Sequence, residues 1–362
     1  NIPFGIFKTE NISPRAATII GNTLIDLAAL LEHGFLKVEG LKMEMLKNPF
    51  LNDFIAAGKA VTNAVRLKVA ELFLENSTLK NDSKIASCLF NINEVELMLP
   101  VKIGDYTDFY SSEDHATNVG KMFRDPANAL LPNWKHLPVG YHGRSSSIVV
   151  SGTNFHRPKG QTKADDEAMP TFQPCRLLDF ELEMAFVVGK STHMGESIST
   201  SHAEDHIFGL CLFNDWSARD IQKWEYVPLG PFLAKNFCSG LSPWIVTIEA
   251  LEPFRTDGYK QVPEVLPYLK YEGNKNYDIH LDVFIAPENK EETQVCHSNF
   301  KFMYWNMCQQ LAHHTVNGCN VNVGDLMASG TISGPTPDSF GSMLELSWQG
   351  KNSVKLLSLI HI

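Results

Sequence analysis

The sequence predicts a mainly β chain with some α-helix, arranged as a small N-terminal domain over residues 1–99 and a larger C-terminal domain over residues 100–362. Short apolar runs bounded by turn residues recur along the chain and are typical of strands. Helical periodicity is confined to a few segments, of which residues 52–74 form the longest. Candidate catalytic groups occur only after Leu99, so we place the domain boundary there.

Composition limits the class of protein. The 362 residues are 44% hydrophobic, enough for a large core. The net charge of -10 argues against nucleic acid or an anionic membrane as the main partner. No apolar run reaches transmembrane length, and no signal peptide is visible. The seven cysteines are widely spread and form no CxxC pair, so we expect buried, reduced thiols and a cytoplasmic protein.

The N-terminal region is predicted to be a small α+β unit. Three short strands are expected at residues 4–8, 17–20 and 23–25. A helix over residues 26–36 should end near Gly34, because glycine is common just after a helix. A long helix over residues 52–74 follows.

A strand over residues 102–110 opens the C-terminal region and contains Asp108. Ser111 and Asp114 then form a capping-box pattern, which predicts the start of a helix. His115 lies in the first turn of that helix, where the helix dipole disfavours a positive charge. We expect a neutral histidine that can accept a proton, with a solvated histidine at a helix end as the alternative.

Two further strands bring carboxylates into view. Glu181 and Glu183 share one face of a strand over residues 179–186, because strand side chains alternate between two faces. A solvated acidic face is the alternative, since Glu is mostly exposed in proteins. The continuous apolar run over residues 207–213 predicts a buried strand, and Asp215 stands at its end. A carboxylate in that place is a candidate site residue.

A helix is predicted directly after this carboxylate. Ser217 and Asp220 form another capping-box pattern. Arg219, Gln222 and Tyr226 follow at the i, i+3 and i+7 spacing of one helix face. That face carries a fixed cation, an amide and a phenol, which suits a polar pocket. An ordinary solvated helix face is the alternative.

The remaining segments are predicted from local signals. Residues 138–144 are expected to be a loop, and residues 156–171 an exposed mobile loop rich in Pro, Gly and charge. A helix over residues 299–316 is expected to be capped by Ser298. Alternation over residues 343–347 predicts a strand.

Six motifs together resemble the fumarylacetoacetate hydrolase family. They are DYTDFYSS at residues 105–112, HATNVG at 115–120, LPVGYHGR at 137–144, ELE at 181–183, NDWSARDIQ at 214–222 and SGTISG at 329–334. The resemblance covers nearly the whole chain. It implies an SH3-like N-terminal domain, a mixed β-roll as the C-terminal domain and a cytoplasmic homodimer. It also implies a hydrolase that splits a carbon–carbon bond of fumarylacetoacetate in tyrosine and phenylalanine catabolism, with a small diketo-dicarboxylate as its substrate.

The resemblance also implies a metal-dependent active site. The metal ligands would be Asp108, Glu181, Glu183 and Asp215. An all-oxygen set selects a hard cation, Ca²⁺ or Mg²⁺. A second cation would lie beside Asp215, with Lys235 and Ser239 as further ligands through main-chain or hydroxyl oxygens.

The other roles implied by the resemblance fall to polar groups around that metal. His115 would be the base, oriented by Glu345. Donors to the developing oxyanion would be Arg219, Gln222 and Lys235. Substrate contacts would come from Tyr110, Arg124, Tyr141, Gln222, Tyr226 and Thr331.

The chain departs from the family in two places. Cys238 and Ser239 stand where the family has Gly-Thr, and the serine hydroxyl can still serve as a ligand. After residues 348–350 the family continues through further strands, whereas this chain closes on an apolar tail at residues 356–362. We therefore expect a chain truncated at its C-terminus. The alternatives to fumarylacetoacetate hydrolysis are a related acylpyruvate hydrolase and a catalytically inactive, metal-binding fragment.

Overall fold

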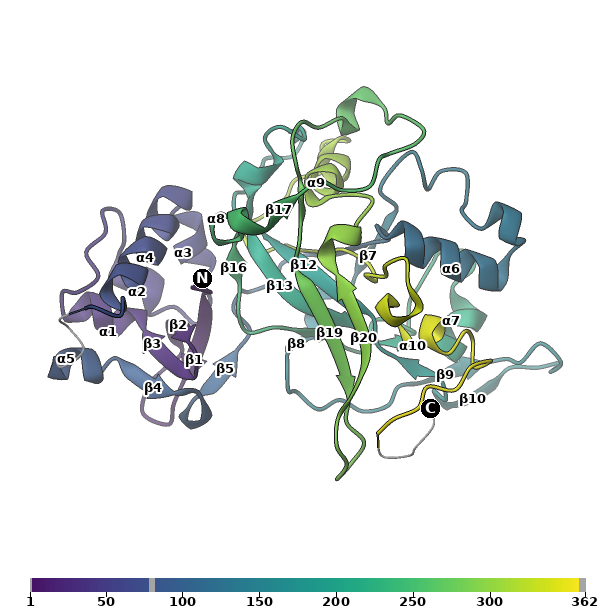
Figure 1. The fold of residues 1–362 in the computed structure, drawn as a ribbon, viewed down its shortest axis with the longest axis horizontal. Coiled ribbons are helices and arrows are strands. Elements are labelled where there is room, and N and C mark those ends of the chain that lie inside the picture. Colours follow the sequence, from purple (N-terminus) through teal and green to yellow (C-terminus); the bar gives the residue numbers. More distant parts are fainter. Residues whose placement is uncertain (1, 78–81, 358–362) are drawn as a thin grey trace.

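The structure, a computed structural model, describes residues 2–77 and 82–357 and comprises a smaller and a larger unit side by side (Figure 1). The smaller unit is an antiparallel sheet in the order β4-β3-β2-β1-β5, with several helices packed on it. The strands are β1 (Gly5–Lys8), β2 (Arg15–Ile20), β3 (Thr23–Asp26), β4 (Leu89–Asn91) and β5 (Glu96–Met98). The helices are α1 (Leu27–Glu32), α2 (Met43–Leu46), α3 (Asn52–Ala56), α4 (Lys59–Leu72) and α5 (Ser83–Ala86).

The three predicted N-terminal strands are confirmed, and the two helix predictions need revision. The first helix begins where expected, with Asp26 as its N-cap, and already ends at Glu32. The long helix predicted over residues 52–74 is two helices, α3 and α4. Gly58 separates them with a φ of 89°, a conformation that interrupts a right-handed helix.

The larger unit is organised around an eight-stranded sheet, in the order β7-β6-β21-β12-β13-β15-β8, with β16 also paired to β13. Its strands are β6 (Tyr106–Phe109), β7 (Gly140–Gly143), β8 (Ile148–Val150), β12 (Leu182–Val188), β13 (Ile207–Asp215), β15 (Ser239–Leu241), β16 (Val246–Thr247) and β21 (Leu326–Ala328). Its helices are α6 (Glu113–Phe123), α7 (Arg219–Glu225), α8 (Ile248–Leu251), α9 (Met307–Thr315) and α10 (Met343–Leu346).

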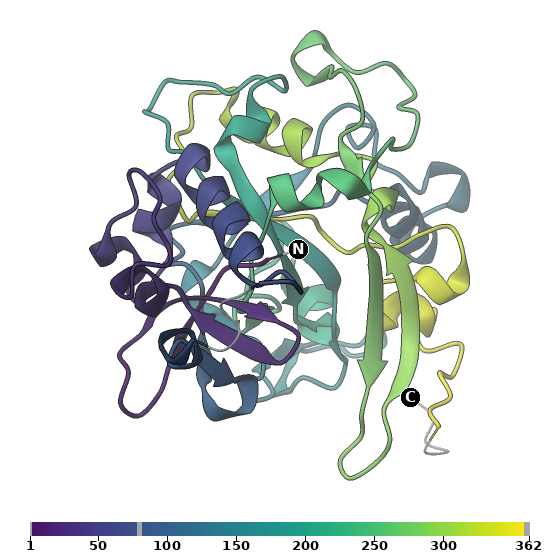
Figure 2. The same ribbon diagram turned by 60° about the vertical axis from the view of Figure 1, so that its left-hand side comes forward.

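Four strand pairs complete this unit, and β19 and β20 form a long hairpin at its edge (Figure 2). The pairs are β9 (Lys159–Thr162) with β10 (Thr171–Pro174), β11 (Leu178–Asp179) with β14 (Ser217–Ala218), β17 (Arg255–Thr256) with β18 (Asn276–Tyr277), and β19 (His280–Ile285) with β20 (Thr293–Asn299). The segment predicted as a mobile loop over residues 156–171 therefore includes β9 and is anchored by β10. The segment predicted as a loop at residues 138–144 contains β7.

Two later predictions are wrong in kind. Ser298 lies in β20 and caps no helix; α9 begins at Met307, where Asn306 caps it in a reciprocal box with Gln309. Residues 343–346 form the helix α10 and not a strand, because the Ser342 side chain accepts from the backbone N–H of Glu345 and caps it. The apolar alternation there was too short to distinguish the two structures.

One hydrophobic cluster runs through both units. Phe4, Phe54 and Val65 from the smaller unit belong to the same core as Phe208 and Ile245 from the larger one. Phe4 also exchanges two backbone hydrogen bonds of 2.8 Å with Ile245. The two units therefore share part of their core, and the division into domains 1–99 and 100–362 stays a prediction.

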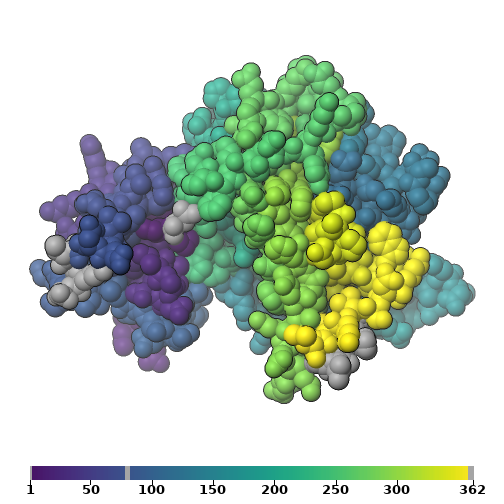
Figure 3. All heavy atoms as spheres, viewed as in Figure 1, coloured from purple at the N-terminus to yellow at the C-terminus, as the bar shows by residue number. Residues whose placement is uncertain are grey.

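The C-terminal segment lies alongside the β19–β20 hairpin (Figure 3). Leu356 is buried, and the Leu357 N–H donates to the Thr293 hydroxyl at 2.8 Å. The rest of the predicted apolar tail, residues 358–362, lies outside the described residues. All seven cysteines are free thiols, and six of them are buried, as predicted. Over residues 2–77 and 82–357, none of the helices has the length and apolar character needed to cross a membrane.

Candidate active site

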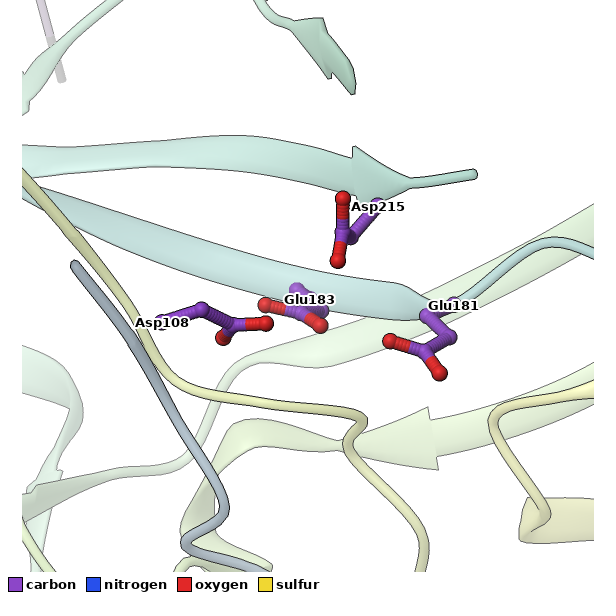
Figure 4. A group of neighbouring side chains, drawn as sticks. All are labelled: Asp108, Glu181, Glu183 and Asp215. Atoms are coloured by element: carbon purple, nitrogen blue, oxygen red, sulfur yellow. The ribbon is translucent and has the colours of Figure 1, made fainter. Parts of the chain in front are cut away.

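Four buried carboxylates meet where the central strands end (Figure 4). Asp108 lies on β6, Glu181 directly before β12, Glu183 on β12 and Asp215 at the end of β13. β12 pairs with β13 on one side and with β21 on the other, and β21 pairs with β6, so the sheet order brings these residues together. One oxygen from each carboxylate lies within 4.8 Å of the others.

The burial of these acids strongly affects their ionisation. Burial, and then the charge of a neighbouring carboxylate, raises the pKa of Asp108 and Glu183 well above their usual range. Burial also raises the pKa of Asp215, although the charge of Lys235 opposes it. For Glu181 the burial effect is outweighed by Lys235 and Arg219, which hold its pKa below the usual range.

This cluster could hold a metal ion. Asp108 Oδ1 and Glu183 Oε1 are buried and have no hydrogen-bond partner among the described residues, so each has a lone pair available for a ligand. Every ligand atom is a carboxylate oxygen, which suits a hard divalent cation. Such a cation would also offset the cost of burying several negative charges together.

Lys235 already supplies one positive charge to the cluster. Its Nζ lies 2.5 Å from Glu181 Oε2 and 2.7 Å from Asp215 Oδ2. Burial lowers the pKa of this ammonium, but the charges of Asp215 and Glu181 more than compensate and raise it. The Ser239 hydroxyl donates to Asp215 Oδ1 at 2.8 Å, and the Tyr141 hydroxyl donates to Asp215 Oδ2 at 3.1 Å. Three of the predicted site residues thus converge on Asp215.

A glycine fixes the position of Glu183. The Gly330 N–H donates to Glu183 Oε2 at 3.1 Å, and Gly330 has a φ of 76°. A Cβ atom there would lie 2.2 Å from the Phe109 carbonyl oxygen. Thr331 follows, buried, with its hydroxyl unpaired among the described residues.

Replacing Gly330 with Ala is expected to destabilise the fold, because a positive φ in a residue with a side chain costs about 1–3 kcal/mol before any clash. The clash with Phe109 adds to that cost. Gly152→Ala is the matched control: its φ is 91° and a Cβ there would meet nothing within 4 Å. Urea unfolding of both variants measures the difference. Equal losses would show that contact with Phe109 is not what requires glycine.

His115 and Glu345 form a buried pair on helices α6 and α10. The His115 Nδ1 atom lies 2.7 Å from Glu345 Oε2. Burial tends to raise the pKa of Glu345, but the His115 charge and several hydrogen bonds lower it below its usual value. An ionised carboxylate only accepts hydrogen bonds, so Nδ1 is the nitrogen that donates to Glu345. In the neutral imidazole, Nε2 is then the nitrogen that can accept a proton.

Three residues that the sequence analysis missed hold Glu345 in place. Asn118 Nδ2 donates to Oε1 at 3.0 Å, and the Ser333 and Ser342 hydroxyls donate to Oε2 at 2.8 and 2.9 Å. Two signals were present: Asn118 lies one helical turn after His115, and Ser342 stands three residues before Glu345, as in a capping box. No local sequence pattern indicates the contact between Ser333 and Glu345, because it forms only when the chain folds.

The helix start near His115 also differs from the prediction. Ser112, and not Ser111, is the N-cap of α6, and its hydroxyl accepts from the His115 N–H at 3.1 Å. Asp114 bonds the Tyr259 hydroxyl instead of closing a capping box. His115 keeps its predicted place in the first turn and is buried.

Arg219 and Gln222 meet on the predicted face of α7, but the predicted capping box is wrong. Ser217 lies in β14, and α7 begins at Arg219 without a side-chain cap. Asp220 instead accepts from the Arg176 N–H and the Cys175 thiol.

The side chain of Arg219 makes its contacts within the buried site. Its Nη1 lies 2.8 Å from Glu181 Oε1 and donates to Gln222 Oε1 at 3.1 Å, while its Nε donates to Asp179 Oδ2 at 2.8 Å. Its Nη2 is buried without a partner among the described residues. Asp179 is a further buried acid that the sequence analysis passed over.

The remaining predicted substrate residues divide into two groups. Tyr110 lies edge-on to His115, with ring centroids 5.2 Å apart, and Tyr141 and Thr331 lie beside the carboxylates as described. Arg124 is exposed and donates to the Ala129 carbonyl at 2.7 Å. Tyr226 is 50% exposed at the end of α7. The assignment of Arg124 and Tyr226 to substrate binding stays a prediction.

Comparisons with known proteins cover both units. Residues 105–354 match the family described as fumarylacetoacetate (FAA) hydrolase C-terminal, and residues 1–100 match fumarylacetoacetase N-terminal. Fumarylacetoacetase of Dictyostelium discoideum is 55% identical over 362 residues, 98% of this chain and 85% of the relative. The Homo sapiens fumarylacetoacetase is 51% identical over 361 residues, 98% of this chain and 86% of the relative.

A solved structure shows the same fold. Fumarylacetoacetate hydrolase from the psychrophilic Exiguobacterium antarcticum superposes with a TM-score of 0.54 at 15% identity, over 100% of this chain and 97% of that one. At this identity the likeness concerns the fold alone. The two fumarylacetoacetases are about half identical to this chain over nearly its whole length, and this similarity shows the family to which the chain belongs.

Proposed function

This chain belongs to the fumarylacetoacetate hydrolase family, and we propose that its buried carboxylates and the His115–Glu345 pair form the active site in which it hydrolyses fumarylacetoacetate. The enzyme is a hydrolase of carbon–carbon bonds, and its products are fumarate and acetoacetate. The observation that carries the site assignment is the buried His115–Glu345 pair, in which His115 Nδ1 lies 2.7 Å from Glu345 Oε2. A place in tyrosine and phenylalanine catabolism follows from this substrate.

We propose that a divalent cation, Ca²⁺ or Mg²⁺, is held by Asp108, Glu181, Glu183 and Asp215. When bound, it would act as a Lewis acid that polarises the oxygens of the diketone substrate. A second cation is proposed beside Asp215, with the Ser239 hydroxyl and the Lys235 main-chain oxygen as ligands. The Lys235 ammonium cannot itself bind a cation.

The protein groups supply proton transfer and charge stabilisation. His115 Nε2 takes a proton from water, while Glu345 holds the imidazole through Nδ1. The hydroxide adds to a carbonyl carbon of the substrate and produces an alkoxide. Arg219, Gln222 and Lys235 are proposed to donate hydrogen bonds to that oxygen. The carbon–carbon bond then breaks. The leaving carbanion is stabilised as an enolate and takes back the proton that His115 Nε2 removed from water.

Substrate recognition is proposed to use hydroxyls, one amide and one further cation. The residues are Tyr110, Arg124, Tyr141, Gln222, Tyr226 and Thr331. The guanidinium of Arg124 suits a carboxylate, since arginine binds planar anions through paired hydrogen bonds. Because the substrate carries two carboxylates and two keto groups, several such donors are needed to orient it.

Loss of the diketone absorbance of fumarylacetoacetate on incubation with the purified protein tests the function. His115→Asn, assayed in parallel, shows whether the turnover comes from this site. An acylpyruvate tested under the same conditions examines the alternative hydrolase. Faster turnover of the acylpyruvate would overturn the substrate assignment, and no turnover of either would favour a catalytically inactive, metal-binding protein.

A cytoplasmic homodimer is proposed as the working form. The support is the family resemblance, together with the large apolar side chains that the monomer exposes around the end of α7, such as Val227, Leu229 and Phe232. Sedimentation of the purified chain at several concentrations measures the oligomeric state, and a monomer at every concentration would contradict it.

Gln222→Ala is expected to lower kcat by about 10²–10³-fold, the usual effect of removing one oxyanion donor, and to change KM little. Arg219→Lys should act in the same direction while keeping a charge for Asp179 and Glu181. Tyr226→Phe on the same helix is expected to raise KM and leave kcat nearly unchanged. Steady-state kinetics of the three variants show which residues act on kcat and which act on KM. If Gln222→Ala raises only KM, Gln222 binds the substrate and does not stabilise the oxyanion.

A further inference from the structure

Asp179 lies at the centre of the contacts that link Arg219 to the His115–Glu345 pair. We propose that Asp179 is a positioning residue: its carboxylate sets Arg219 and the Glu345-bearing helix α10 relative to one another, so that the oxyanion donors and the base meet the same substrate atom. This inference rests on the proposed function of the site. Asp179 touches neither the His115–Glu345 pair nor the four-carboxylate cluster directly.

The carboxylate of Asp179 has three donors from two elements. Its Oδ2 accepts from Arg219 Nε at 2.8 Å. Its Oδ1 accepts from the Met343 N–H at 2.7 Å, and Oδ2 also accepts from the Leu344 N–H at 3.1 Å. Met343 and Leu344 are the first two residues of α10, and Glu345 is the third. One side chain therefore joins the start of that helix to Arg219.

This arrangement also determines which edge of the arginine remains available. Asp179 holds Nε, and Glu181 and Gln222 hold Nη1. Nη2 is left buried without a partner in the described part of the chain. A guanidinium is a rigid planar fork, so a bond at Nε fixes the direction in which Nη2 points. The unpaired N–H group is then ready for a substrate oxygen.

On the other side, Asp179 determines where Glu345 stands. The helix α10 is only four residues long, so it has little stability of its own. Two of its first backbone N–H groups are held by Asp179, which is itself 3% exposed. A shift of this short helix would move Glu345 and with it the orientation of His115. Backbone pairing of Asp179 with Ser217, two residues before Arg219, ties the same point to the start of α7.

The first test is Asp179→Asn, which keeps the shape and removes the charge. Outer residues that orient a reacting group are typically worth 10–100-fold, so kcat is expected to fall by about that factor with little change in KM. In the Arg219→Lys background the same substitution should cost less, because the bond to Arg219 Nε is already lost and only the hydrogen bonds to α10 remain to be removed. Unchanged kcat, or a rise in KM alone, would overturn the proposal.

The matched control is Asp26→Asn in the smaller unit. Asp26 is also a buried aspartate, 1% exposed, that binds a helix-start N–H and an arginine, here Ala29 and Arg15. It should lose stability as Asp179→Asn does, while its kcat stays at the wild-type value. If both variants lose kcat equally, the loss in Asp179→Asn reflects reduced stability of the whole fold. The proposal that Asp179 is a positioning residue would then be refuted.

A readout that does not need turnover separates this proposal from the function itself. With ¹⁵N-labelled histidine, the proton shared by His115 Nδ1 and Glu345 gives a downfield resonance, which His115→Asn assigns. We expect Asp179→Asn to move or broaden it and Asp26→Asn to leave it in place. An unmoved resonance overturns the proposal even if the protein does not hydrolyse fumarylacetoacetate. Asp179→Glu, which keeps the charge and displaces it, carries the same test if the Asn variant does not fold.

Discussion

His115→Asn is expected to lower kcat by about 10²–10⁴-fold, the usual worth of a general base. Asparagine fills a similar space and can still donate to Glu345, but it has no nitrogen that accepts a proton from water. The buried carboxylates are untouched, so metal binding should be kept. Steady-state kinetics with fumarylacetoacetate, together with elemental analysis of the bound metal, measure both quantities.

Glu345→Gln should act through the same step. It removes the carboxylate that orients the imidazole through the 2.7 Å hydrogen bond. Residues that act as a unit are strongly non-additive, so the double variant should be little worse than His115→Asn alone. If the two losses multiply, the histidine and the glutamate do not work together.

Removal of divalent metal is expected to abolish turnover, and Mg²⁺ or Ca²⁺ should restore it. Asp108 Oδ1 and Glu183 Oε1 have no hydrogen-bond partner among the described residues, so removal of a bound cation would leave both oxygens unpaired. Metal should also stabilise the fold, by about 2.7 kcal/mol at a concentration 100 times the dissociation constant. Assay and thermal unfolding of the chelated and reloaded enzyme measure both effects. Full activity in a protein shown to be metal-free would contradict the prediction.

The same cluster predicts how metal affinity depends on pH. Burial raises the pKa of Asp108 and Glu183 in the metal-free protein, so below those pKa values protons occupy the cluster. The metal binds only the ionised acids, so binding should release protons and weaken as the pH falls. Calorimetric titration in two buffers of different ionisation enthalpy counts the released protons. Binding without proton release would show that both acids are already ionised.

The parts of the fold that follow local rules were predicted from the sequence. The apolar run that ends at Asp215 matches β13, whereas the strand predicted over residues 179–186 begins only at Leu182. Glu183 lies on that strand and Glu181 directly before it, and both belong to the carboxylate cluster. The i, i+3 spacing of Arg219 and Gln222 corresponds to a real contact. These patterns succeed because strand and helix periodicity is a property of a few consecutive residues.

What the sequence did not reveal depends on contacts between distant residues. Ser217 and Asp220 look like a capping box. In the structure Ser217 lies in β14, and Asp220 accepts a hydrogen bond from the segment before β11. Glu345 is 230 residues from His115, and no local pattern encodes their pairing. Asp179 carries no motif of its own. Its donors gather only once β11, α7 and α10 have packed.

The core that runs through both units determines how a substitution in the smaller unit affects the activity of the protein. Phe4 and Ile245 belong to one cluster, so the small unit and the catalytic unit should melt in a single cooperative transition. A substitution in the small unit would then reduce how many molecules are folded in a cell, while each surviving molecule keeps its turnover number. Loss of activity from such a change is a loss of abundance, and it can be relieved by anything that binds and stabilises the native state.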